Sequence, residues 1–565
     1  MTLLVNSPSD FAGDALAGFA ATQPDRVLPV PGGVVRSRST TEGQVAVVMG
    51  GGSGHFPAFS GWVGPGFGSA AACGNIFASP SENQILSVAR SADSGGGVLF
   101  VPINYAGDIL HFSAAVEKLR LDGVDARMIA VTDDIASAST DDRALRRGIA
   151  GSFTVLKIIG AAAEAGQSID TVERIAIAAN EATRSFGVAF SGCTLPGSAE
   201  PLFTVPAGRV AVGLGIHGEP GISESELGSA DDIADLLVDG LFAERAPEAG
   251  RPLAVLVNGL GATKYDELFV VFDRVRARLE AVGMSLVAPV VGEQVTSYDM
   301  AGLSLSVTYL DDELERLWLA PADSASFTRG EIAGGQRRTV TTESAPEIDV
   351  PPASSESRAA VAWLVAQLKS AEAVLVANES LLGELDAVAG DGDHGAGMVR
   401  GVTAAVSAAV DIAAKDAGLG SVLASAGAAW SDRAGGASGA LWGAGLTAAG
   451  EAIGNETVPG PQILVRAISA FGAAIGARGG AIVGEKTMID AIDPFAEEFA
   501  ASIRRGAKPV DAWRDAATRA REAADATAGL IARRGRSRTH GDHSVGTADP
   551  GATSFALLVS HLPVE

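Results

Sequence analysis

Three closely spaced aspartates form a candidate metal site. Asp386, Asp391 and Asp393 lie in the segment 385–395, with glycines between them. Clusters that offer only oxygen suit Mg²⁺, which binds carboxylates together with substrate phosphates. The spacing does not fit an EF-hand, which needs a glycine at its sixth position and a later glutamate. A capped helix–turn–helix is the alternative, but the glycines leave room for a nucleotide between the aspartates.

A glycine-rich segment, Gly50–His55, directly follows an apolar run that ends at Met49. Consecutive glycines after a strand allow backbone N–H groups to face a phosphate or a hydroxylated ligand. The segment is not a Rossmann fingerprint, because Pro57 stands where the last glycine is needed. A tight turn is the alternative, although His55 favours a site because ligands bind at the carboxyl ends of strands. We expect three further residues to contact the ligand: Gly52, Ser53 and Gly54.

Two more chemically capable residues follow apolar runs. Asp108 comes after the run 97–102 and offers either a base or a helix N-cap. His217 is bracketed by glycines within Gly213–Gly221, which is unlike a residue that packs in a core. Because a neutral imidazole is a nucleophile as well as a base, His217 can attack a carbonyl group.

The elements that must position these residues differ between the two parts of the chain. Up to about residue 332, apolar runs at 44–49, 97–102, 126–131 and 252–257 alternate with helical patterns such as 82–90, which Ser81 caps, and 112–121. This alternation predicts an α/β domain over 1–332. A Ser/Thr/Pro-rich linker follows over 333–357, and 358–565 is Ala-rich with helical spacing. We therefore expect an all-α second domain, whose first helix spans 359–382.

At these residues the chain resembles the dihydroxyacetone kinase family, in its single-chain, ATP-dependent form. The resemblance runs almost from end to end. It is carried by segments 50–57, 77–81, 104–108, 146–151 and 215–221. It implies that His217 forms a covalent hemiaminal with the ketose carbonyl, while His55 and Asp108 assist at the hydroxyl that is phosphorylated. A covalent bond to a carbonyl would reject polyols such as glycerol.

The resemblance also implies that the second domain is an eight-helix barrel that binds ATP. Its aspartates would hold two Mg²⁺ ions that bridge the phosphates. The segment 484–490 is not a P-loop, because Glu485 breaks the motif and no strand precedes it. The residues that match nucleotide contacts of the family are His394, Gly395, Ala396, Gly397, Ala437, Ser438, Thr487, Met488, Arg536, Asp549, Pro550 and Gly551.

Departures from the family pattern concern the substrate. Phe56 and Ile103 stand where the dihydroxyacetone pattern has Glu and Lys, and segments 54–59 and 63–66 are more like the branch that acts on four-carbon ketoses. Erythrulose is thus expected before dihydroxyacetone. The alternatives are a phosphotransferase-system-coupled kinase, a lyase that releases cyclic FMN and a non-catalytic sugar-binding regulator.

Composition limits the partners and the compartment. The net charge of −25 repels phosphodiester backbones, which argues against nucleic acid. Two cysteines, Cys73 and Cys193, suit a reducing cytoplasm, and no apolar run is long enough to span a membrane. We therefore expect a cytoplasmic protein. Because the donor and acceptor sites lie on separate domains, we also expect the active site to form between the two domains, in a homodimer.

Overall fold

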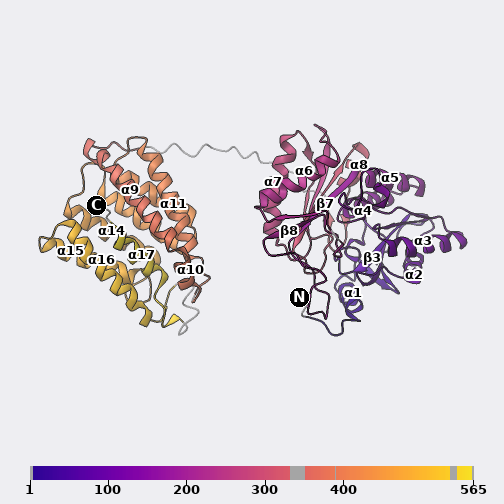
Figure 1. Ribbon diagram of the computed structural model, residues 1–565, viewed down its shortest axis with the longest axis horizontal. Coiled ribbons are helices and arrows are strands. Elements are labelled where there is room, and N and C mark those ends of the chain that lie inside the picture. Colours follow the sequence, from indigo (N-terminus) through magenta and orange to yellow (C-terminus); the bar gives the residue numbers. More distant parts are fainter. Residues whose placement is uncertain (1–3, 220, 331–349, 389, 535–543, 563–565) are drawn as a thin grey trace. The chain divides into compact units, whose positions relative to one another are not determined.

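The computed structural model describes residues 4–219, 221–330, 350–388, 390–534 and 544–562 (Figure 1). The chain divides into two compact units, residues 1–337 and 338–565. Most of the expected linker, 333–357, lies outside the described residues. Helix α9 begins at Ser355, so the last residues of the expected linker are helical.

The first unit contains a six-stranded sheet in the order β1-β2-β4-β3-β5-β6, in which β4, β3, β5 and β6 are parallel. Its strands are β1 (Val27–Val30), β2 (Gly33–Arg36), β3 (Ala46–Ser53), β4 (Ala70–Ile76), β5 (Val98–Pro102) and β6 (Ala126–Met128). Successive residues of β3 point to opposite faces, as a strand requires. Val48 packs with α2 (Glu82–Ala92) and α3 (Ala106–Leu121), whereas Val47 packs with α4 (Ser152–Glu164). Helices therefore cover both faces of this sheet.

A second, seven-stranded sheet has the order β11-β10-β13-β7-β8-β9, with β12 paired to β10. Its strands are β7 (Thr183–Ala189), β8 (Arg209–Val212), β9 (Ser223–Glu226), β10 (Pro252–Gly259), β11 (Ser285–Leu286), β12 (Val290–Gly292) and β13 (Gly302–Tyr309). One face packs on α6 (Ala230–Glu244) and α7 (Tyr265–Ala281). The other face contributes Ala254 and Leu256 to the core that also contains α4, α5 (Ile169–Ala182) and α8 (Asp312–Leu319).

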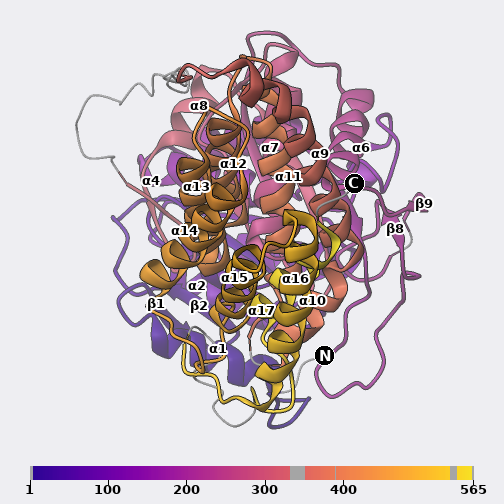
Figure 2. The same ribbon diagram turned by 90° about the vertical axis from the view of Figure 1, so that its left-hand side faces the viewer.

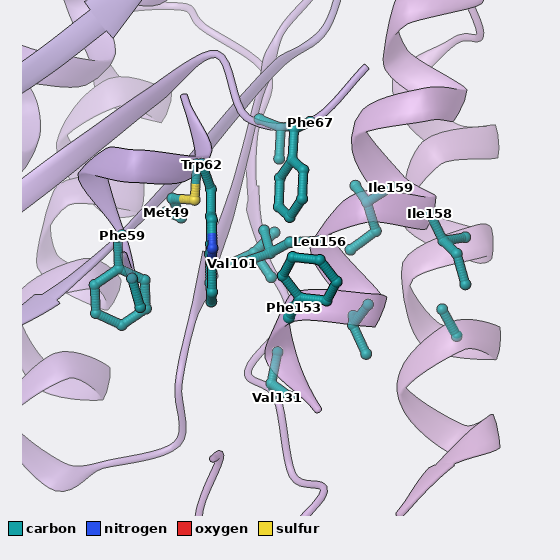
Figure 3. Close-up of a cluster of buried hydrophobic side chains, with 14 of the residues drawn as sticks. Met49, Phe59, Trp62, Phe67, Val101, Val131, Phe153, Leu156, Ile158 and Ile159 are labelled. Carbon is teal, nitrogen blue, oxygen red and sulfur yellow. The ribbon is translucent and has the colours of Figure 1, made fainter. Parts of the chain in front are cut away.

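The core shared by the two sheets is built around aromatic rings. Trp62 stacks on Phe67 and meets the edges of Phe59 and Phe153, as Figure 3 shows. Phe153 and Leu156 come from α4, so this helix is buried between the two sheets. The packing fixes one sheet against the other.

The second unit is helical throughout its described residues, apart from turns (Figure 2). Its α-helices are α9 (Ser355–Ala377), α10 (Glu379–Ala387), α11 (His394–Ala413), α12 (Leu419–Ala434), α13 (Gly436–Ile453), α14 (Pro461–Gly479), α15 (Ile489–Arg504), α16 (Pro509–Ala526) and α17 (Pro550–His561). Glycines let α12 and α13 approach closely: a Cβ on Gly427 would lie 2.8 Å from the carbonyl oxygen of Gly443. Helices α9 and α11 are long and apolar enough to cross a membrane by length and composition alone, but both contribute side chains to the core of this unit.

Two helix boundaries differ from the sequence prediction. Helix α3 begins at Ala106 rather than at 112, so Asp108 lies in its first turn and Tyr105 is its N-cap. The single helix predicted up to Leu382 is interrupted at Asn378, whose side-chain amide donates to the carbonyl oxygen of Val374. This local bond competes with a continuous helix.

Candidate active site

His217 lies in the loop between β8 and β9, and its imidazole is held on both sides. Its Nδ1 donates to Oε1 of Glu219 at 2.9 Å, and its backbone N–H donates to Oε2 of the same carboxylate at 2.6 Å. The rings of Tyr105 and Phe77 meet the imidazole edge-on, at centroid distances of 4.8 and 4.9 Å. About a fifth of the His217 side chain is exposed (21 %).

His55, at the end of the glycine-rich segment, faces His217. The two Nε2 atoms are 2.9 Å apart, and Nδ1 of His55 lies 2.7 Å from the carbonyl oxygen of Thr296. A carbonyl only accepts, so Nδ1 of His55 carries a hydrogen. Burial, followed by the charge of His217, lowers the pKa of His55 to about 3. A neutral His55 therefore turns the lone pair of its Nε2 toward His217.

Asp108 is the third predicted catalytic residue, and its carboxylate is almost entirely buried. One of its oxygens, Oδ1, has no hydrogen-bond partner. Burial raises the pKa of Asp108 to about 6, while a hydrogen bond from Ser79 and the charge of His217 oppose the rise. A carboxylate with a free oxygen and a raised pKa is suited to accept a proton near neutral pH.

The glycine-rich segment itself packs mainly against protein. A Cβ on Gly52 would lie 2.6 Å from the backbone nitrogen of Ala78, and the hydroxyl of Ser53 donates to the carbonyl oxygen of Gly74. Gly54 has φ +101°, which favours glycine. These residues also line an apolar cavity of about 450 Å³ beside α1 (Phe11–Thr22).

The two departures from the family pattern occupy different surroundings. Phe56 is half exposed and packs edge-on against Phe19 of α1 at 5.4 Å. Ile103 is buried in the core between the sheets, next to Gly148.

The second group of predicted residues gathers in the helical unit. Carboxylate oxygens of Asp386, Asp391 and Asp393 all lie within 4.8 Å of one another. Oδ2 of Asp386 is buried without a hydrogen-bond partner. Three carboxylates at this spacing, one with an unsatisfied oxygen, fit a Mg²⁺ ion.

Beside the aspartates, His394 connects three helices. It begins α11, and its Nδ1 and Nε2 lie 3.2 and 3.0 Å from the hydroxyls of Ser438 on α13 and Ser554 on α17. Burial lowers the pKa of His394, so the ring is neutral at pH 7. Gly395, Ala396 and Gly397 form the first turn of α11.

A pocket of about 340 Å³ joins most of the predicted nucleotide contacts. Its lining includes Asp386, His394, Ala437, Ser438, Thr487, Met488, Asp549, Pro550 and Gly551. Arg536 lies outside the described residues. The pocket has an apolar side, formed by Leu441, Ile475 and Ala481, and is large enough for a planar base and a sugar.

Comparison with known proteins places the chain in a family. The Dak1 domain matches residues 17–326 and the DAK2 domain matches 388–563. An L-erythrulose 1-kinase and a D-erythrulose kinase of Mycolicibacterium smegmatis are 52 % and 50 % identical. The alignments cover 100 % and 99 % of this chain and 99 % and 97 % of the relatives. The chain belongs to the dihydroxyacetone kinase family. The family and the α/β plus all-α fold predicted from the sequence are thereby confirmed.

Solved structures and shorter relatives add to this assignment. The dihydroxyacetone kinase of C. freundii, crystallised with AMP-PNP and Mg²⁺, matches with TM-score 0.59 and 29 % identity over 99 % of both chains. The dihydroxyacetone-binding subunit of a PTS-dependent kinase of Listeria innocua is 38 % identical but covers only 58 % of this chain. Together with the full-length kinase relatives, the first match confirms the prediction of an ATP-dependent sugar kinase that works with Mg²⁺.

The structure also reveals polar residues of this family member that the sequence reasoning did not select. Lys486 lines the nucleotide pocket, but its ammonium nitrogen lies within hydrogen-bond distance of four backbone carbonyl oxygens, which its three N–H donors share: those of Thr527, Leu530, Ser544 and Thr547. The lysine therefore fixes the chain on both sides of 535–543 and is not arranged as in a P-loop. Arg534 lines the pocket and pairs with Glu485 at 2.7 Å. The only feature of the sequence that pointed to Arg534 is its position close to Arg536, which was predicted to contact the nucleotide.

Proposed function

We propose that the protein transfers the γ-phosphoryl group of ATP to a terminal hydroxyl of a short-chain ketose, with erythrulose preferred over dihydroxyacetone. The observation that carries this proposal is the pair formed by His55 and His217, which holds a nucleophile and a proton acceptor 2.9 Å apart. The erythrulose preference is supported by the two full-length erythrulose kinase relatives. Because one acts on the L form and the other on the D form, we propose no enantiomer.

On the acceptor side, Nε2 of His217 attacks the ketose carbonyl carbon. The proton that it shares with His55 moves to His55, the electron pair of Nε2 forms the C–N bond, and the carbonyl oxygen takes the proton back as a hydroxyl. The product is a hemiaminal. This bond orients the terminal hydroxyl and excludes glycerol, which has no carbonyl group.

The hydroxyl that is phosphorylated needs a base. The free Oδ1 of Asp108 supports this role, since it is buried with no competing hydrogen-bond donor. With a pKa of about 6, Asp108 is ionised at pH 7.5 and can accept the hydroxyl proton as the phosphoryl group transfers.

On the donor side, Asp386, Asp391 and Asp393 would hold Mg²⁺, which neutralises phosphate charge. His394 and Ser438 line the pocket, and hydrogen bonds to Ser438 and to the buried Ser554 fix the His394 ring. The apolar side of the pocket would take the adenine. Burial, with the charge of Asp490, raises the pKa of Asp549 to about 7, which weakens its repulsion of the phosphates.

Two of the alternative functions, the phosphotransferase-system-coupled kinase and the non-catalytic regulator, have relatives that match only part of this chain. The PTS-dependent subunit and an operon co-activator that matches in structure cover 58 % and 56 % of this chain, whereas this chain also contains the helical unit. The aspartate cluster and the nucleotide pocket of that unit support direct use of ATP. Homodimer formation and a cytoplasmic location stay predictions.

One assay tests the proposal. Purified protein with Mg-ATP is offered D-erythrulose, L-erythrulose, dihydroxyacetone and glycerol, and ADP release is followed together with the mass of the product. We expect release with the ketoses, fastest with an erythrulose, and none above background with glycerol. Absence of ketose-dependent ADP release would overturn the kinase proposal.

A further inference from the structure

We propose that Glu219 is a positioning residue that keeps His217 in its reactive orientation and balances the positive charge of the covalent adduct, while Arg147 keeps Glu219 in place. This inference rests on the proposed hemiaminal chemistry. No motif or relative discussed above assigns a role to either residue.

The carboxylate of Glu219 is committed to His217 through both oxygens. Oε2 accepts from the backbone N–H of His217, and Oε1 accepts from Nδ1 of its ring. These two bonds fix the backbone and the ring of one residue relative to each other. Burial disfavours the charge on Glu219, but the hydrogen bond and charge of His217 still hold the pKa of Glu219 below its usual value.

The loop is built to allow this contact. A Cβ on Gly215 would lie 2.0 Å from Oε2 of Glu219 and 2.6 Å from a guanidinium nitrogen of Arg147. Only glycine therefore leaves room for the carboxylate at this point. The requirement is steric, because the space is already filled by the two charged groups.

Arg147 forms the next link. It pairs with the buried Asp134 at 2.8 Å and donates to the carbonyl oxygen of Gly213 at 3.1 Å, which ties it to the start of the same loop. Its other guanidinium nitrogen is 3.8 Å from Oε2 of Glu219. A charge chain of Asp134, Arg147, Glu219 and His217 thus leads from the core to the nucleophile.

This row of charged residues has two chemical consequences. First, Nδ1 is occupied by Glu219, so only Nε2 is presented to a carbonyl. Second, both neighbours of the His217 ring accept hydrogen bonds: Glu219 as a carboxylate and His55 through its Nε2 lone pair. The Glu219 carboxylate therefore lies beside the ring nitrogen that is not used in the C–N bond, where it balances positive charge that forms on the imidazole of the adduct.

A role in positioning predicts a signature that a merely structural role would not produce. Without the carboxylate, neither the orientation of the His217 ring nor positive charge on the adduct is stabilised. The fraction of ketose held as the tetrahedral adduct should therefore fall, whereas ATP binding in the helical unit should not change. The other charged or titratable groups around the ring, His55, Tyr105, Asp108 and Arg147, are unchanged in the variant.

The test compares Glu219→Gln, Gly215→Ala and the control Glu224→Gln, an exposed residue on β9. Calorimetry at pH 7.5 measures the affinity for erythrulose. Kinetics gives KM for the ketose and for ATP. NMR of ketose labelled with ¹³C at its carbonyl measures the tetrahedral adduct.

For Glu219→Gln we expect a smaller adduct fraction, a ketose KM raised about tenfold to hundredfold and an unchanged KM for ATP. Gly215→Ala, which displaces the carboxylate without removing it, should raise the ketose KM and lower the adduct fraction. The control should match the wild type. If Glu219→Gln forms the adduct to the same extent as the wild type, with a ketose KM within about twofold, the inference is overturned. Failure of the wild type itself to phosphorylate any ketose would instead overturn the proposed function.

Discussion

His55 and His217 are 162 positions apart in the sequence, yet their Nε2 atoms lie 2.9 Å from each other. His55 is buried, and its other ring nitrogen is held by a carbonyl oxygen, so this contact is the only use left for its lone pair among the described residues. The pair therefore combines a partly exposed imidazole, which we propose as the nucleophile, with a buried imidazole, which we propose as its proton acceptor.

Replacing the nucleophile should abolish selectivity for ketoses. We expect His217→Ala to lower kcat/KM for erythrulose by about 10³-fold or more, because the orientation that the covalent bond provides is lost. Any residual activity should no longer distinguish erythrulose from glycerol. Coupled-enzyme kinetics measures both values, and AMP-PNP affinity, expected to be unchanged, is the control. Retained discrimination in this variant would contradict the hemiaminal.

The acid limb of the pH profile should report Asp108. Burial raises its pKa to about 6, and a base must be ionised, so kcat of the wild type should fall as the pH drops below about 6. Asp108→Asn should lower kcat by about 10²–10⁴-fold and remove this limb. The measurement is kcat from pH 5 to 8.5 with saturating ketose and ATP. An unchanged acid limb in the variant would assign it to another group.

The same substitution should stabilise the α/β unit. The folded-state pKa of Asp108 lies above its unfolded value, so the native state binds more protons between about pH 4 and 6, and the cost of the buried charge is complete above that window. Asp108→Asn should therefore raise the free energy of unfolding at pH 8 by up to about 3 kcal/mol, and by less at pH 5. Urea unfolding at the two pH values tests this, with the exposed Asp141→Asn as the matched control. An equal gain at both pH values would refute it.

Removing a metal ligand should affect nucleotide binding rather than folding. Asp386→Asn and Asp391→Asn should each reduce kcat at least about 10²-fold and abolish the Mg²⁺ dependence of AMP-PNP affinity, because phosphate charge is no longer neutralised. Calorimetry with and without Mg²⁺ measures the affinity. Glu384→Gln, an exposed carboxylate on the same helix as Asp386, should behave as the wild type. Full Mg²⁺ dependence in both aspartate variants would exclude the cluster as the site.

The buried ion pair of Arg146 with Glu244 should be a stability determinant of the α/β unit. Both guanidinium nitrogens bond to the carboxylate, at 2.9 and 3.0 Å, and the arginine is fully buried. Arg146→Met should cost about 3–5 kcal/mol in free energy of unfolding, because Glu244 loses its bidentate partner. Chemical unfolding measures this, with the exposed Arg90→Met as control. A loss below about 1 kcal/mol would show that Arg184, which also contacts Glu244, compensates.

Much of the fold follows from local sequence patterns. The helix after Ser81 has the expected N-cap, and the structure adds a capping box, because Gln84 returns the bond that Ser81 makes. The apolar runs before His55 and Asp108 became β3 and β5, since runs of this kind are typical of parallel strands buried on both faces. The break at Asn378 was missed because one side-chain bond interrupts an otherwise continuous apolar pattern.

The site was predictable by residue type, but not by geometry. The glycines around His217 indicated a functional loop, yet the role of Glu219 depends on a turn that brings residue i+2 back to the imidazole. Thr296 could not have been selected at all, because a backbone carbonyl has no signature in the sequence. Gly52 was selected for ligand contact, whereas its closest surroundings are the backbone of Phe77 and Ala78.

The bond between His55 and Thr296 joins the end of β3, in the first sheet, to the segment after β12, in the second. The reactive pair thus exists only when both sheets have folded and docked through α4. In a chain that has completed just its first sheet, during synthesis or after partial unfolding, His55 lacks the Thr296 carbonyl that accepts its Nδ1 hydrogen, and the His217 loop is not beside it. Ketose turnover therefore reports complete folding of the α/β unit, because a chain without the docked second sheet lacks the His55–His217 pair.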